Sequence, residues 1–97
     1  MENNRLAFAL GMAQKAGKTA SGDFAVRSAL KSGRVKLLII ATDTAPNTKK
    51  DLYFMAEQFR VKAIEAGTKA ELGYAIGKAQ RTAVALTDIN FAKMLKK

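Results

Sequence analysis

The chain has 97 residues, of which 48% are hydrophobic, and its 17 Lys and Arg residues against 8 Asp and Glu residues give a formal net charge of +9. It contains no cysteine and no histidine, which excludes disulfides, thiolate or imidazole metal sites and the commonest catalytic nucleophiles and bases. We therefore expect one domain over residues 1–97, no catalytic activity, no cofactor, no metal and a polyanionic partner.

A membrane role is not expected for this chain. Its longest purely apolar run is residues 37–41, far shorter than the roughly 20 residues of a membrane-spanning helix. The amino terminus, Met1-Glu2-Asn3-Asn4, lacks the basic and then apolar order of a signal peptide. The sequence thus predicts a monomeric cytoplasmic protein whose polyanionic partner is structured nucleic acid.

The first part of the chain predicts a helix, a short strand and a second helix. Residues 4–15 form a helix that Gly17 ends, with an apolar face made of Leu6, Ala9, Leu10 and Ala13. Residues 18–21 are a weak edge strand. Gly22 and Asp23 open the second helix, which Gly33 ends. Its predicted buried stripe consists of Val26, Ala29, Leu30 and Gly33.

The middle of the chain predicts a central strand, a helix and another strand. Residues 37–41 are apolar without alternation, the pattern of a strand that helices cover on both faces. After Pro46 comes a third helix, whose apolar positions at helical spacing are Leu52, Met55, Ala56 and Phe59. Residues 61–65 form the next strand, which Gly67 ends.

The last part of the chain predicts a helix, a strand and a closing helix. Thr68 and Glu71 fit a capping box at the start of the fourth helix. The inward residues of that helix are Leu72, Ala75 and Ile76. Residues 82–86 are a final buried strand, and residues 88–96 a helix with Phe91 and Leu95 inward and lysines in its last turn. Strands and helices alternate, which predicts an α/β fold, an α-β-α sandwich.

Basic residues gather on the second helix. Asp23, Arg27, Lys31 and Arg34 recur opposite the apolar stripe, facing solvent, and Lys15 and Lys18 precede them. Such a stripe alone is as often a solvated surface as a binding face. At the start of this helix, however, Gly22 leaves backbone N–H groups free to bind a phosphate, and Ser21 adds a hydroxyl donor.

Two other features have a structural and a functional interpretation. Gly73 and Gly77, four residues apart, lie in a helical pattern without the order of a nucleotide-binding loop, so close packing of the backbone is the favoured explanation. The aromatic residues Tyr53, Phe54 and Tyr74 are scattered and are interpreted as core and rim. Phe24, beside Gly22, is the one aromatic candidate for contact with a base.

Residues 13–22, Ala-Gln-Lys-Ala-Gly-Lys-Thr-Ala-Ser-Gly, and residues 71–78, Glu-Leu-Gly-Tyr-Ala-Ile-Gly-Lys, resemble the two signatures of the L7Ae/L30e ribosomal-protein family. The Lys-Ala-Gly-Lys version is similar to the bacterial, YlxQ-like branch. The resemblance covers nearly the whole chain. It implies a three-layer α-β-α sandwich with a mixed four-stranded sheet, and binding of kink-turn RNA, a sharply bent duplex with tandem sheared G·A pairs and a flipped-out base.

The chain departs from the family at the RNA site that the resemblance implies. The family has a Gly-x-Asn-Glu segment at the start of the second helix and a lysine one turn later. Here the Asn and Glu positions are Phe24 and Ala25, the lysine position is Ser28, and Ala45 replaces the acidic residue before the proline. Direct base contacts are therefore lost, so we expect recognition through phosphates and shape.

The leading hypothesis is a ribosome- or RNA-associated protein that binds kinked RNA. Its expected phosphate partners are Lys15, Lys18, Arg27, Lys31, Lys69 and Arg81. Ser21, Gly22 and Asp23 would position the RNA backbone at the bend. A second hypothesis is a protein-interaction module in which Phe24 and Ala25 make an apolar contact. A third is an accessory domain of an RNA-modifying enzyme, for which the chain holds no catalytic part.

Overall fold

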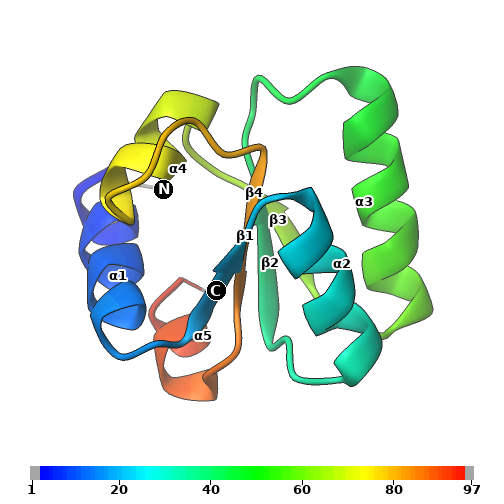
Figure 1. Ribbon diagram of the computed structural model, residues 1–97, viewed down its shortest axis with the longest axis horizontal. Coiled ribbons are helices and arrows are strands. Elements are labelled where there is room, and N and C mark those ends of the chain that lie inside the picture. Colours follow the sequence, from blue (N-terminus) through cyan, green and yellow to red (C-terminus); the bar gives the residue numbers. More distant parts are fainter. Residues whose placement is uncertain (1–2, 96–97) are drawn as a thin grey trace.

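The computed structural model describes residues 3–95 (Figure 1). The elements in chain order are α1 (Asn3–Lys15), β1 (Thr19–Ser21), α2 (Asp23–Ser32), β2 (Leu37–Ile40), α3 (Pro46–Gln58), β3 (Ala63–Glu65), α4 (Lys69–Ala75), β4 (Ala83–Leu86) and α5 (Ile89–Leu95). The strands form one sheet in the order β1-β4-β2-β3. Strands β2 and β3 are parallel and the other neighbours are antiparallel. The predicted mixed four-stranded sheet is confirmed.

Helices cover both faces of this sheet. Figure 1 shows α1, α4 and α5 on one face and α2 and α3 on the other. The central strands β2 and β4 are buried along their whole length. Because alternate residues of a strand point to opposite faces, Leu37 and Ile39 enter the core under α1, α4 and α5, whereas Leu38 and Ile40 enter the core under α2 and α3. The unbroken apolar run of β2 therefore contributes side chains to both hydrophobic cores, one on each face of the sheet.

The expected helices and strands are all present, with small differences. Gly33 ends α2 as predicted, but it is exposed and does not belong to the buried stripe, because its left-handed conformation (φ 79°) turns the chain away from the core. Lys96, Met1 and Glu2, to which the sequence analysis referred, lie outside the described residues. Within residues 3–95 no helix is long and apolar enough to cross a membrane.

Several chain connections meet at one end of the sheet, the upper end in Figure 1. Here β1 leads into α2, β2 leads towards α3, β3 leads towards α4, and loop 77–82 leads into β4. Hydrogen bonds join these connections: Ala41 N–H donates to Thr82 O at 2.9 Å, and Thr42 N–H donates to Gly67 O at 2.8 Å. As a result the amino-terminal ends of α2, α3 and α4 lie at the same end of the molecule. We call it the upper end below.

Candidate nucleic-acid interface

The junction between β1 and α2 is formed by Gly22. Its backbone (φ 90°, ψ 153°) lies in a region that is essentially restricted to glycine. The Gly22 carbonyl accepts the first helical hydrogen bond, from Val26 N–H at 3.0 Å, and no side chain caps the helix. The first N–H groups of α2 therefore point outwards, together with the positive end of the helix dipole, which favours an anion there.

Arg81 is fixed beside this junction. Its Nε donates to Ser21 Oγ at 3.1 Å, and its Nη1 donates to the carbonyls of Gln80 at 3.0 Å and Ala79 at 3.3 Å. Among residues 3–95 no carboxylate forms an ion pair with Arg81. The guanidinium is thus held in place by neutral groups, and its charge stays available to a ligand next to Gly22.

Lys69, the first residue of α4, lies at the same end. Its carbonyl accepts from Arg81 N–H at 3.1 Å, so the start of α4 and loop 77–82 are in contact. Unlike α2, this helix is capped within the protein: Thr68 and Glu71 form the predicted capping box, and Asp43 Oδ1 accepts from Lys69 N–H at 2.8 Å. The N–H groups of Thr68, Lys69 and Glu71 therefore have partners within the protein, and the charge that α4 offers a ligand is the Lys69 ammonium.

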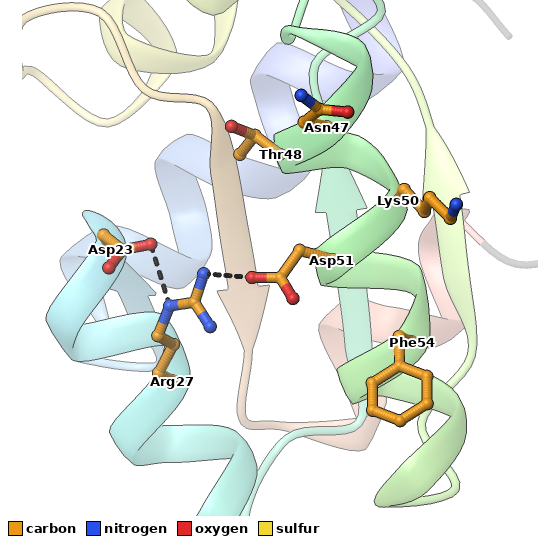
Figure 2. A pocket seen from close by; sticks show the side chains of 7 residues that line it. All are labelled: Asp23, Arg27, Asn47, Thr48, Lys50, Asp51 and Phe54. Carbon is orange, nitrogen blue, oxygen red and sulfur yellow. Dashed lines mark hydrogen bonds and ion pairs between the residues drawn. The ribbon is translucent and has the colours of Figure 1, made fainter.

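Arg27 differs from the expectation that it faces solvent. Figure 2 shows its guanidinium between α2 and α3, where Nε pairs with Asp23 Oδ1 at 2.9 Å and Nη2 pairs with Asp51 Oδ2 at 2.6 Å. Its Nη1 also contacts Met55 Sδ at 3.0 Å. The side chain is only 32% exposed, and the hydrogen bonds to Asp51 and then Asp23 raise its pKa. Arg27 joins two helices, so the expectation of a solvent-facing cation is wrong.

The groove around Arg27 has a volume of about 520 Å³. Its lining residues are Asp23, Arg27, Asn47, Thr48, Lys50, Asp51 and Phe54 (Figure 2). The two carboxylates balance the two cations, so this groove has no net formal charge. A polyanion gains little attraction from it, in contrast to the neighbouring surface with Lys69 and Arg81.

The three remaining predicted lysines do not lie near Gly22. The Lys18 carbonyl accepts from Thr87 N–H at 3.0 Å, which places Lys18 where β4 ends, at the opposite end of the sheet. Lys15 ends α1 just before it, and Lys31 is in the last turn of α2. The structure therefore brings together one part of the predicted set, namely Ser21, Gly22, Asp23, Phe24, Lys69 and Arg81, and separates Lys15, Lys18 and Lys31 from it.

One basic residue near this surface was absent from the predicted set. Lys78 is exposed and belongs to loop 77–82, the loop that carries Arg81. Its N–H donates to Gly73 O at 2.8 Å, which fixes the loop against the end of α4. Its position in the Glu71-to-Lys78 motif, three residues before Arg81, is the signal by which the sequence could have indicated it.

The interpretation that close packing requires a glycine is confirmed for Gly73 and is wrong for Gly77. Gly73 is buried, and a Cβ atom on it would lie 2.0 Å from the Ala79 carbonyl oxygen. Loop 77–82 can approach α4 because this side chain is absent. Gly77 has a φ of 71° and follows α4, so the expectation that it lies within the helix is wrong. It turns the chain out of the helix into the loop.

Comparison with known proteins gives consistent results. The model of the ribosomal protein L7Ae/L30e/S12e/Gadd45 family matches residues 4–96. The chain is similar to the RNA-binding protein YlxQ of Bacillus subtilis, with 35% identity over 89% of this chain and 86% of that protein. It is also similar to the large ribosomal subunit protein eL30 of Neurospora crassa, with 34% identity over 71% of this chain and 64% of that protein.

Among solved structures, a protein of unknown function from Bacillus halodurans has a similar fold. The two superpose with a TM-score of 0.86 at 31% sequence identity, and the match covers 96% of this chain and 94% of the other. The similarity therefore extends over the helices and strands that form the upper end.

Proposed function

The chain belongs to the ribosomal protein L7Ae/L30e/S12e/Gadd45 family, and from this we propose that it is a single-domain, cytoplasmic protein that binds structured RNA. The family consists of ribosomal and related proteins, and the chain is a binding protein, not an enzyme. The name of the Bacillus subtilis relative, an RNA-binding protein, supports the assignment of RNA as the partner.

The observation that carries the proposal is the position of Arg81 beside Gly22. Arg81 is held by Ser21 and by two carbonyls, without a carboxylate partner, next to the uncapped start of α2. A phosphate there would accept hydrogen bonds from helix N–H groups and from the guanidinium together. Lys69 and Lys78 extend the same surface. A net charge of +9 attracts RNA to it over a longer range.

The RNA in this proposal is kinked, as in a kink-turn, and the protein recognises it by phosphate contacts and shape. Phe24, Ala25 and Ser28 have no side chain that forms a bidentate hydrogen bond with a base edge. Arg81 contacts both Ser21, just before α2, and Lys69, the first residue of α4. This end of the molecule therefore offers a compact set of phosphate contacts, which suits a bend where phosphates converge. Ribosomal RNA is one such partner, and the proposal takes the protein to be a monomer.

The experiment compares cations at the two ends of the sheet. Arg81→Ala and Lys69→Ala are each expected to weaken binding of a kink-turn hairpin by about tenfold, because each removes a charged phosphate contact. Lys62→Ala is the matched control, since Lys62 is an exposed lysine just before β3, at the other end of the sheet. Binding is measured by fluorescence anisotropy and the melting temperature by circular dichroism.

If Lys62→Ala or Lys18→Ala abolished binding while Arg81→Ala and Lys69→Ala left it unchanged, the interface would lie at the other end and the proposal for the upper end would be wrong. The melting temperatures separate loss of contact from loss of fold, which matters for Arg81 because it also bonds to Ser21.

A second candidate function is a protein-interaction module on this fold. The observation in its favour is the exposure of Phe24 (84%) and Phe54 (64%). Large exposed apolar side chains often mark protein contacts. This function predicts binding that is insensitive to salt and to Arg81→Ala, and the same titrations therefore separate the two candidates.

A further inference from the structure

Phe24 is the second residue of α2, and its side chain takes no part in the core. The buried face of the helix is formed by Val26, Ala29 and Leu30, whereas Phe24 is 84% exposed. A phenyl ring in water gains free energy when a flat apolar surface covers it. The ring lies two residues after Gly22, about 3 Å along the helix axis, and is therefore adjacent to the proposed phosphate position.

The ring belongs to a shallow hollow on the outer face of α2. The hollow has a volume of about 260 Å³ and is lined by Phe24, Arg27, Ser28 and Lys31. These positions are three, four and seven residues after Phe24, which places them on one side of the helix. The hollow therefore combines an aromatic face, a hydroxyl group and two cations within one helix surface.

The two cations of this hollow differ in what they can do. Arg27 is fixed by Asp23 and Asp51, so it forms a rigid wall with little charge to offer. Lys31 is exposed and forms no ion pair among residues 3–95. It lies about 10 Å along the axis from Phe24, a distance at which its long side chain can reach the phosphate of a nucleotide stacked on the ring.

An aromatic ring beside a lysine fits a nucleotide better than it fits an apolar protein side chain, because the surrounding molecule carries a charge of +9. Within a continuous duplex both faces of each base are covered by neighbouring bases. Only a base that has left the stack can lie on the ring. The ligand of this hollow is thus an unpaired nucleotide next to the duplex held at Gly22.

We propose that Phe24, Ser28 and Lys31 form a subsite for one unpaired nucleotide, with its base stacked on the Phe24 ring and its phosphate on Lys31. This inference rests on the proposed function and deepens it. It gives a role to Lys31, which does not belong to the surface at the upper end. It also explains how an RNA-binding protein can tolerate Phe24 where its resemblance to the family leads one to expect a polar residue.

The test uses a hairpin RNA with tandem sheared G·A pairs beside a bulge, and 2-aminopurine replaces each bulge nucleotide in turn. A matched RNA has an abasic site at the same place. We expect wild-type protein to quench one 2-aminopurine and to prefer the intact RNA over the abasic RNA by about 5- to 150-fold. Phe24→Ala should lose this preference and bind both RNAs as wild type binds the abasic one.

The control variants separate stacking from apolar contact. Phe24→Tyr keeps an aromatic face and should retain the preference, whereas Phe24→Leu is apolar without such a face and should lose most of it. Lys31→Ala should weaken binding of both RNAs equally. Because Phe24 is exposed, all Phe24 variants should keep the wild-type melting temperature.

Three results would overturn the subsite. In the first, wild-type protein binds both RNAs equally and no 2-aminopurine is quenched. In the second, Phe24→Ala weakens binding of the intact and the abasic RNA by the same factor, which would indicate a general contact. In the third, Phe24→Leu behaves as Phe24→Tyr. In each of these results RNA is still bound, so the proposed function stands. If wild-type protein bound neither RNA, the proposed function would fail as well.

Discussion

Gly22 is required by the conformation of its backbone and not by close packing of other residues. Its φ of 90° is unfavourable for any residue with a side chain, while apart from Ser21 and Asp23, its neighbours in the chain, no described residue has an atom within 4 Å of the position a Cβ would take. We expect Gly22→Ala and Gly22→Val to lower the free energy of unfolding by about 1 to 3 kcal/mol through backbone strain. Urea unfolding measures this loss. A Gly22→Ala protein as stable as wild type would show that the junction relaxes.

Arg27 has a structural role, joining α2 to α3, that the basic stripe in the sequence did not indicate. Because its guanidinium joins α2 to Asp51 of α3, Arg27→Ala should destabilise the protein by about 1 kcal/mol, the upper range for a partly exposed pair. The same change should affect RNA binding less than Arg81→Ala does. Lys31→Ala, on the same helix, is the control and should leave stability unchanged.

A double-mutant cycle with Asp51→Ala assigns the effect of Arg27. If the two changes were additive, the ion pair between α2 and α3 would not contribute to stability, and the loss in Arg27→Ala would have to come from the pair with Asp23 or from the contact with Met55.

Glu65 at the end of β3 gives the protein a pH dependence. The Lys49 ammonium bonds to one carboxylate oxygen at 2.9 Å and the Tyr53 hydroxyl donates to the other at 2.8 Å. These bonds, that from Lys49 first, lower the pKa of Glu65. Its stabilising contribution is therefore present above the pKa of the unfolded chain and is lost as pH falls through the lower pKa of the folded state.

Glu65→Gln should accordingly reduce stability at neutral pH and flatten the loss of stability in acid. At the lowest pH the melting temperatures of the two proteins should converge. Glu57→Gln, on the exposed face of α3, provides the comparison. If the melting temperatures of wild type and Glu65→Gln fell equally as the pH was lowered, this account would be contradicted.

At the scale of the elements, replacing two helical glycines, Gly73 and Gly11, by alanine is expected to have opposite effects on stability. Gly73→Ala would bring a Cβ within 2.0 Å of the Ala79 carbonyl oxygen, whereas Gly11→Ala would bring it to an ordinary 3.5 Å from Ala75 O. We expect Gly73→Ala to cost about 1 to 3 kcal/mol by overpacking. Gly11→Ala should instead stabilise α1 by about 0.5 to 1 kcal/mol. Thermal unfolding of both variants checks the pair.

Gly73→Ala should also weaken RNA binding, because the loop it displaces carries Lys78 and Arg81. Gly11→Ala should leave RNA binding unchanged. If Gly73→Ala kept both its stability and its affinity, loop 77–82 would not depend on its contact with α4.

At the scale of the whole molecule, cations among residues 3–95 lie at both ends of the sheet, with Lys69 and Arg81 at the upper end and Lys18 and Lys62 at the other. If RNA contacts the upper end and the proposed nucleotide subsite, a small number of cations neutralise phosphates, chiefly Lys69, Lys78 and Arg81, together with Lys31 in the last turn of α2. The slope of log affinity against log salt should then be about −3 to −4. Titration in potassium chloride measures it. A slope near zero would favour the protein-interaction module, and a much steeper one would show that Lys15 and Lys18 also bind RNA.

The local patterns of the sequence determined the elements of this fold. Apolar periodicity predicted the helices and strands, the Thr68–Glu71 spacing predicted the capping box, and the apolar run at residues 37–41 predicted a strand buried on both faces. These patterns are reliable because they arise from the geometry of a single helix or strand, which the neighbouring residues in the chain set directly.

Only the tertiary structure decided which cations lie together. Arg81 reaches Ser21 from 60 residues away, and Arg27 meets Asp51 on another helix, while Lys18, only four residues before Gly22, lies at the opposite end of β1. The apolar periodicity of a helix or strand indicates which face a residue occupies. It does not indicate which residues of other elements lie next to that residue. Sequence proximity therefore grouped Lys15, Lys18 and Arg27 with Gly22, and the family resemblance added Lys69 and Arg81. Of these five cations, packing leaves Lys69 and Arg81 free beside Gly22, because partners across elements depend on how the layers fold together.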